Sequence, residues 1–164
     1  MGTEGTVLIV DDLESVTTTY ERNLGFEDRM KEIAPNVKII RQLSSGTRDT
    51  HRSTVENMLQ AYPEITGIFC ADGDRTLGSY VACQANNRQD VLIAGYDATA
   101  EQLEVMLNDG PECNLICSTA LYPDRIGALA IETAYDILQG EEVEPIQYSE
   151  IGLLTAEDAE SWGG

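Results

Sequence analysis

Positive charge is scarce in this sequence. Its 164 residues include 29 aspartates and glutamates but only 10 lysines and arginines, which gives a formal net charge of −19. Only Lys31 and Lys38 are lysines. A surface this acidic repels phosphate backbones and anionic lipids. We therefore expect no nucleic-acid partner and no anionic membrane surface as a partner.

Long apolar runs and targeting signals are missing too. No run approaches the ~20 apolar residues of a transmembrane helix, so we expect no membrane insertion. The opening Met1–Gly5 leads within two residues into the apolar run Val7–Val10. It has neither the basic n-region nor the cleavage site of a signal peptide. As written, the chain is expected to carry no export signal.

Residues that support catalysis or metal binding are few. The one histidine, His51, has no serine or cysteine elbow nearby, and we expect it to be exposed. Cys70, Cys83, Cys113 and Cys117 form no CxxC pair, so we expect buried free thiols. No phosphate-binding G-x-x-x-x-G-K loop occurs. The sequence therefore predicts no enzyme, no metal ion and no cofactor.

Short β-branched runs alternate with longer stretches of helical periodicity. Strands are expected at Thr6–Val10, Val37–Arg41, Gly67–Cys70, Val91–Ala94, Asn114–Ser118 and, less clearly, Ile146–Tyr148. Helices are expected at Thr17–Ile33, Arg48–Tyr62, Thr76–Ala85, Ala100–Asn108 and Pro123–Leu138. Such alternation predicts a flavodoxin-like, doubly wound parallel sheet in a three-layer α/β/α arrangement. Residues 1–154 form one predicted α/β lobe, followed by an acidic tail at 155–164.

The last expected helix has a distinct apolar face. Pro123 suits its first turn, where a proline loses no needed N–H. Ile126, Ala130, Ala134 and Ile137 share one side of the helix. This spacing predicts a stripe that packs into a core.

Polar residues follow several of the expected strands. Asp72 and Asp74 come after the third strand, and Tyr96 and Asp97 come after the fourth, while Arg22 lies on the first helix. In doubly wound sheets, ligands bind beyond the carboxyl ends of the strands. Carboxylates accept hydrogen bonds from vicinal hydroxyls, arginine donates them, and aromatic rings pack on sugar faces. This edge therefore predicts a site for a small, neutral, polyhydroxylated ligand.

Each of these residues also has an ordinary structural role open to it. Asp72 and Asp97 can cap the helices that follow them. Arg22 can be an exposed helix residue, and Tyr96 can belong to the core.

Four stretches of the chain, taken in order, resemble the periplasmic sugar-binding (ribose-binding-like) family, whose ligand module is shared with LacI-type repressors. The likeness runs from about Gly5 to Leu154 and covers only the carboxy-terminal lobe of such a protein. The stretches are Arg22–Phe26 (R-x-x-G-F), Ile68–Gly78 (A-x-N-D-x-x-A-x-G), Asp90–Asp97 (D-V-x-V-x-G-F-D) and Tyr122–Glu141 (P-x-x-x-G, ending in L-x-G-E).

The resemblance implies a non-catalytic, sugar-binding lobe of an ABC-transporter substrate-binding protein with a periplasmic or extracellular parent. It implies that Arg22 and Asp97 hold sugar hydroxyls. Asp72 stands where the family has an asparagine ligand, and Asp74 substitutes in part for an aspartate that is missing at the preceding position. Leu121 stands where relatives often have a polar ligand residue. The implied partners are a sugar, an amino-terminal lobe and an ABC permease.

The length of the chain departs from the family. In relatives, the segment corresponding to residues 122–150 crosses to the amino-terminal lobe. Here the helix at 123–138 must dock elsewhere, either on its own sheet or on another chain. A homodimer or a swapped helix would therefore provide a docking surface for residues 123–138.

Two other functions remain as alternatives. The opening Val7–Asp12 resembles a response-regulator receiver, with Asp72 as phosphate acceptor, although no lysine precedes Pro123. The second alternative is the effector-binding half of a LacI-type transcriptional regulator.

Overall fold

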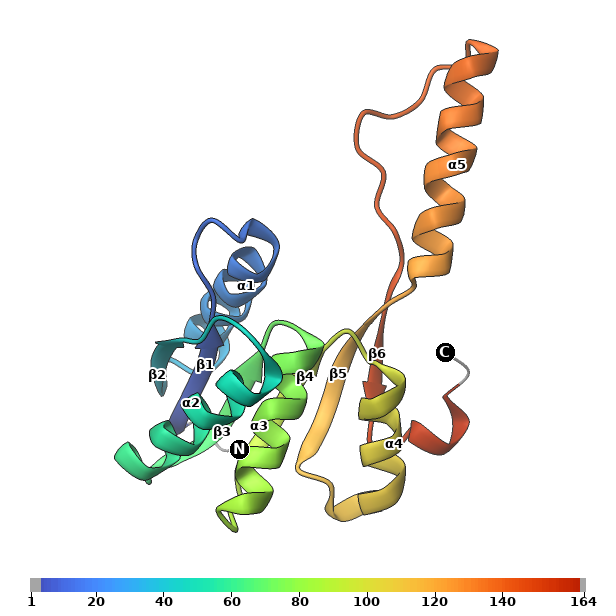
Figure 1. Cartoon of the computed structure of the whole chain (residues 1–164). Coiled ribbons are helices and arrows are strands. Elements are labelled where there is room, and N and C mark those ends of the chain that lie inside the picture. The colour runs from blue at the N-terminus through green and yellow to red at the C-terminus, as the bar shows by residue number, and fades with distance from the viewer. Residues whose placement is uncertain (1–3, 163–164) are drawn as a thin grey trace.

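The computed structural model describes residues 4–162, which form one layered α/β unit with a projecting arm (Figure 1). The strands are β1 (Glu4–Asp11), β2 (Asn36–Leu43), β3 (Ile65–Cys70), β4 (Leu92–Tyr96), β5 (Leu115–Leu121) and β6 (Ile151–Thr155). The helices are α1 (Thr17–Ile33), α2 (Arg48–Ala61), α3 (Gly73–Ala85), α4 (Ala100–Asp109), the 3₁₀ turn η1 (Gly110–Glu112), α5 (Pro123–Gln139) and the 3₁₀ turn η2 (Ala159–Ser161).

The six strands form one sheet in the order β2-β1-β3-β4-β5-β6. The first five pair in parallel, and their order is that of flavodoxin-like sheets, so the predicted fold is confirmed. The prediction was wrong for the sixth strand. It lies at Ile151–Thr155 instead of Ile146–Tyr148, and it runs antiparallel to β5.

The core lies mainly between the sheet and the helices α2, α3 and α4. Leu8, Ile65, Ile93, Leu115 and Met106 are fully buried there. Strands covered on both faces read as continuous apolar runs, and β1 has this character. A smaller cluster forms on the opposite face under α1, where the rings of Phe26 and Phe69 stack 4.1 Å apart.

Two helices of the core approach each other through a glycine. A Cβ at Gly78 of α3 would lie 2.9 Å from the carbonyl oxygen of Arg48 and 3.1 Å from the amide nitrogen of Arg52, both on α2. Only glycine permits this close backbone contact. Gly25 of α1 differs, because a Cβ there would meet nothing within 4 Å.

The helix α5 leaves the unit. Figure 1 shows it standing clear of the sheet, beside the chain that returns to β6. None of its 17 residues is buried, so the predicted core stripe of Ile126, Ala130, Ala134 and Ile137 is not part of this core. The helix ends at Gly140, which adopts the left-handed conformation (φ 85°) that suits a helix C-terminus.

The carboxyl-terminal residues pack against α4. Leu154 and Ala159 are buried in the main core with Met106, and Trp162 packs against that core. None of the helices within residues 4–162 combines the length and the apolar character that crossing a membrane requires.

Candidate functional site

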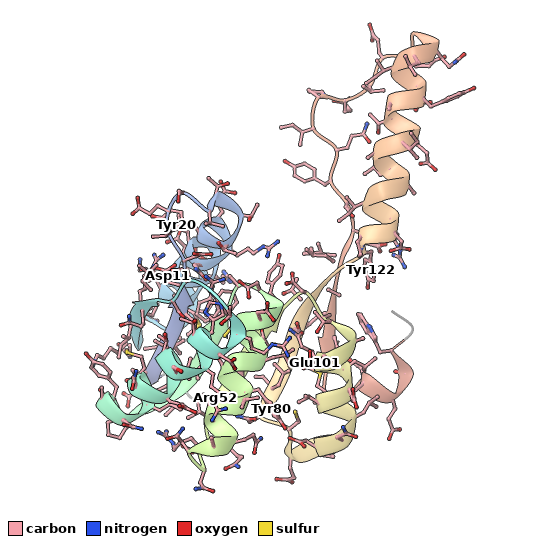
Figure 2. The ribbon with its side chains drawn as sticks, viewed as in Figure 1. Asp11, Tyr20, Arg52, Tyr80, Glu101 and Tyr122 are labelled. Carbon is pink, nitrogen blue, oxygen red and sulfur yellow. The ribbon has the colours of Figure 1, made fainter. Side chains whose placement is uncertain are left out.

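The carboxyl ends of the five parallel strands meet at one edge of the sheet. Figure 2 shows Asp11 at the end of β1 and Tyr122 just after β5, both on this side. Tyr96 and Leu121 are the last residues of β4 and β5, and Asp72 and Asp97 lie in the loops after β3 and β4. The other two predicted site residues, Arg22 and Asp74, lie on α1 and at the start of α3. The topology therefore brings together residues that lie far apart in the sequence.

Arg22, Tyr96 and Asp97 form one cluster at this edge. The Arg22 guanidinium lies 4.1 Å from the centre of the Tyr96 ring. Its Nη1 donates a 2.8 Å hydrogen bond to the carbonyl oxygen of Ala71 and lies 3.8 Å from Asp97 Oδ1. The cation–π contact and the hydrogen bond fix the guanidinium beside the carboxylate. Three residues predicted for the site thus lie in one cluster.

Local backbone geometry orients Asp97. Asp97 and Ala98 both have positive φ (78° and 42°), a region that non-glycine residues rarely adopt. The sharp turn lets Asp97 Oδ2 accept a 2.8 Å hydrogen bond from the Gly73 amide. Asp97 is not a helix cap, because Thr99 caps α4 by accepting from the Gln102 amide. Among residues 4–162, Oδ1 of Asp97 has one recorded contact, the 3.8 Å approach of Arg22 Nη1.

Asp72 is engaged within the protein. It is the N-cap of α3, where Oδ1 accepts a 2.8 Å hydrogen bond from the Arg75 amide. Its Oδ2 forms an ion pair with the Arg75 guanidinium. The capping role foreseen for Asp72 is therefore present, and much of its hydrogen-bonding capacity is already used.

Arg75 is a site residue that sequence analysis missed. It is only 5% exposed, and its guanidinium also pairs with Asp12 at 2.8 Å and donates to the Ser44 carbonyl oxygen at 2.7 Å. Its Nε is buried without a hydrogen-bond partner among the described residues. The only signal in the sequence was the three-residue spacing from Asp72, which places both side chains on one helix turn.

Asp74 and Leu121 lie at the rim. Asp74 pairs with Arg48 at 2.9 Å, and Arg48 also pairs with Glu101 at 2.6 Å, so α2, α3 and α4 are tied together across the opening. Leu121 is half-buried at the end of β5. It contributes an apolar wall where a polar side chain was the family expectation.

Two cavities of about 350 Å³ flank Asp97. One is lined by Asp72, Gly73, Arg75 and His51 in addition to Asp97. The other is lined by Asp97, Leu121, Tyr122 and Trp162, and the last two rings stack 6.5 Å apart. Polar groups from several strand ends converge on the first cavity, and aromatic surface borders the second. This combination is typical of small-ligand sites.

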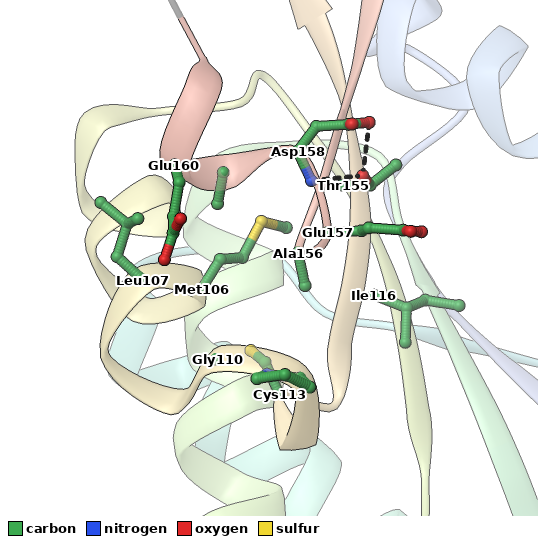
Figure 3. Close-up of a pocket in the computed structure, with 12 residues that line it drawn as sticks. Met106, Leu107, Gly110, Cys113, Ile116, Thr155, Ala156, Glu157, Asp158 and Glu160 are labelled. Atoms are coloured by element: carbon green, nitrogen blue, oxygen red, sulfur yellow. Dashed lines mark hydrogen bonds between the residues drawn. The ribbon is translucent and has the colours of Figure 1, made fainter.

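A larger cavity of about 820 Å³ lies elsewhere, between α4 and the segment from β6 to η2 (Figure 3). Met106, Cys113 and Ile116 line it together with Glu157 and Asp158. Asp158 is occupied by a hydrogen bond from Thr155 Oγ1. The described residues that line this cavity include no lysine or arginine, so its size alone does not make it the preferred ligand site.

Asp11 and Asp12 serve the framework of the site. Burial disfavours the charge on Asp11, but hydrogen bonds from Arg41, the Asp12 amide and Asn23 outweigh the effect of burial and lower the pKa of Asp11.

Within residues 4–162, no group of three or more histidine, cysteine, aspartate or glutamate side chains is arranged to hold a metal ion.

The prediction for His51 was wrong, because this residue is buried. Its Nδ1 lies 2.7 Å from Ser44 Oγ. Burial, reinforced by the nearby positive charge of Arg75, lowers the pKa of the imidazole. A neutral His51 therefore supports the floor of the first cavity.

Comparison with known families agrees with this fold. Residues 1–142 match the family model described as a periplasmic binding protein domain. The chain belongs to this family.

Individual periplasmic binding proteins resemble the chain over most of its length. The ribose import binding protein RbsB of Escherichia coli is 30% identical over 138 residues, which is 84% of this chain and 45% of that protein. The D-apiose import binding protein of Actinobacillus succinogenes is 27% identical over 159 residues, covering 96% and 46%. The chain thus spans about half the length of these relatives.

Solved structures show the same fold. An ABC sugar transporter subunit from Rhodobacter sphaeroides superposes with a TM-score of 0.81 at 28% identity, covering 94% of this chain and 56% of that one. A periplasmic solute-binding protein from Actinobacillus succinogenes with bound D-allose gives a TM-score of 0.86 at 22% identity, covering 98% and 55%. Neither alternative, the receiver domain or the transcriptional regulator, gains support from these relatives.

Proposed function

We propose that this chain is the sugar-binding lobe of an ABC-transporter substrate-binding protein, and that it binds a small neutral sugar without chemically altering it. The observation that carries the proposal is the cluster of Arg22, Tyr96 and Asp97 beside the two cavities at the carboxyl edge of the sheet. The names of the relatives point to the ligand class, because they include import proteins for ribose and D-apiose.

The chemistry of the cluster suits hydroxyl groups. The side chains of Arg22 and Asp97 are 24% and 33% exposed, so both are accessible to a ligand from solvent. Asp97 Oδ1 has free acceptor capacity, whereas Asp72 is neutralised by Arg75. Asp97 is therefore the principal hydroxyl acceptor in our proposal, with Arg22 donating to ring or hydroxyl oxygens. The Tyr96 ring, held under Arg22, supports this arrangement.

The partners of the parent protein are also a proposal. Because the relatives are about twice as long as the stretch they share with this chain, we infer a parent with a second lobe that closes over the sugar. This parent would lie in the periplasm or outside the cell and deliver the sugar to an ABC permease. In such a parent, α5 would pack on the second lobe. The alternative partner for α5 is a second copy of this chain, in a homodimer or with a swapped helix.

Half of a two-lobed cleft leaves one side of the ligand in water. We therefore expect this chain alone to bind monosaccharides with a millimolar dissociation constant, corresponding to about −4 kcal/mol. The test is a titration of the isotope-labelled chain with D-ribose, followed by chemical-shift changes. Asp97→Asn should weaken binding at least tenfold, on the order of the 1.5–3 kcal/mol that a charged hydrogen bond contributes.

The matched control is Asp28→Asn on the exposed side of α1, which should bind like the original chain. Asparagine tolerates the positive φ of position 97, so the first variant keeps the local backbone. Equal affinities for the original chain and Asp97→Asn would remove Asp97 from the site. If the sugar were chemically converted during the titration, the proposal that the chain only binds its ligand would be wrong.

A further inference from the structure

The end of β5 presents an aliphatic surface to one of the two cavities beside Asp97. Ala120, Leu121 and Pro123 line this cavity of about 350 Å³, and we call these three residues the aliphatic wall. Leu121 is half-buried at the end of the strand, where it pairs in register with Ile151 of β6. Asp97 lines the same cavity. A ligand held by the Asp97 carboxylate therefore also meets the aliphatic wall.

Polar groups near the aliphatic wall are engaged within the protein. Thr99 Oγ1 accepts a backbone hydrogen bond as the cap of α4, and the Ala98 amide donates to Ser118 Oγ at 3.0 Å. Of the described residues that line this cavity, only Asp97 and the exposed Asp124 in the first turn of α5 are charged. A ligand hydroxyl packed against the aliphatic wall would give up its hydrogen bonds to water without replacement, which is unfavourable.

The aromatic rings of this cavity pack mainly against each other. The Tyr122 ring has the Arg125 guanidinium 4.1 Å from its centre, and Trp162 stacks on it at 6.5 Å. The Tyr122 hydroxyl lies against Gly152, where a Cβ would overlap it. Since protein groups already occupy the Tyr122 ring and its hydroxyl, we assign the ligand contact at this end of the cavity to Leu121.

The other end of the site is polar. Asp97 Oδ1 has acceptor capacity for hydroxyl groups, and the Arg22 guanidinium lies 3.8 Å away as a donor. A cavity of about 350 Å³ is at the small end of ligand sites and suits a single sugar ring. The site therefore has hydroxyl-binding groups at one end and aliphatic surface at the other. A sugar that carries a methyl group on its ring matches both ends.

We propose that Leu121 makes the site selective for deoxy sugars in which a methyl group replaces a hydroxymethyl group. The hydroxyls of the sugar meet Asp97 and Arg22, and its methyl group packs on Leu121. This inference rests on the proposed function, because it specifies the ligand of the same site. The aliphatic wall belongs to this chain, so the preference is measurable without a second lobe.

Two matched pairs of sugars test the preference. D-Fucose and D-galactose differ by one oxygen on the exocyclic carbon, and so do L-rhamnose and L-mannose. Trp162 is the only tryptophan of the chain and lines this cavity, so its fluorescence reports on binding there. In the pair that binds more tightly, the methyl sugar should bind at least about fivefold more tightly than its hydroxymethyl partner.

Variants of Leu121 test whether this residue causes the preference. Leu121→Gln supplies a donor and an acceptor for the extra hydroxyl, so the preference should vanish or reverse. Leu121→Ala removes the contact without adding a polar group and should reduce the preference to less than about twofold. The alanine variant keeps the test decisive if the glutamine variant fails to fold. The control is Leu107→Gln on α4, an exposed residue that lines the larger cavity, which should leave the preference unchanged.

The outcomes separate this inference from the proposed function. Tighter binding of the hydroxymethyl sugars by the original chain, or an unchanged preference in the Leu121 variants, would overturn the inference alone. So would binding seen by chemical shifts without any change in Trp162 fluorescence. If neither these four sugars nor D-ribose bound, the proposed function would be overturned together with the inference.

Discussion

Ion pairs between individual charged residues determine how the site is built. Arg75 lies between Asp12 and Asp72, with all three side chains largely buried. Removing one partner of a buried ion pair leaves an uncompensated charge, so Arg75→Met should lower the free energy of unfolding by about 3–5 kcal/mol. Urea denaturation followed by circular dichroism measures this loss.

The matched control is Arg29→Met, because Arg29 pairs with Glu32 at 2.7 Å on the exposed surface of α1. Exposed pairs contribute at most about 1 kcal/mol, so this variant should unfold almost like the original chain. Similar losses in both variants would mean that burial does not strengthen the Arg75 network.

At this scale the sequence predicted where polar residues gather but not how they pair. The order of strands and loops was enough to bring Arg22, Tyr96 and Asp97 to one edge. It could not show that Asp72 is paired with Arg75, because that network also needs Asp12 and Ser44 from other loops. His51 was misjudged for a related reason. Its burial depends on contacts with Ser44 and with α3, and the fold alone brings α3 against α2.

Two glycines in helices offer a contrast at the scale of elements. Gly25→Ala adds a methyl group that meets nothing within 4 Å, so it should stabilise the chain by about 0.5–1 kcal/mol through helix propensity. Gly78→Ala places its methyl group 2.9 Å from the Arg48 carbonyl oxygen, so α2 and α3 must separate and stability should fall. Thermal unfolding of the two variants checks the opposite signs, and a gain for Gly78→Ala would contradict the close contact.

Helix and strand positions were largely readable from local pattern. The helix at Thr17–Ile33 has the predicted bounds, and α5 is one residue longer than expected. The last strand was misplaced because Ile151–Thr155 is selected by its pairing with β5, not by the β-propensity that favoured Ile146–Tyr148. The apolar face of α5 was also recognised, but periodicity identifies a face and not the surface that covers it.

The sequence contains a single histidine, His51, whose side-chain type is the one with an ordinary pKa near neutral pH. Because burial lowers the pKa of His51, the unfolded chain binds a proton before the folded one does. The free energy of unfolding therefore has its full value above about pH 6.5. It declines as the pH falls through that value, by up to about 1.4 kcal/mol per pH unit. Free energies of unfolding measured between pH 5 and 7.5 should show this decline.

His51→Asn keeps a polar group beside Ser44 and removes the titration, so its stability should stay level over the same range. Carboxylates with lowered pKa values, such as Asp11, lose their contribution only below about pH 5. A decline of equal slope in the variant would assign the effect to other groups.

The burial of the thiols has a consequence for redox chemistry. Desolvation raises the pKa of Cys70 and of Cys83 to about 12, so roughly one molecule in 10⁵ carries either thiolate at pH 7. Disulfide exchange and oxidation both require the thiolate. These two cysteines therefore remain unreactive in oxidising surroundings for as long as the fold keeps them from water.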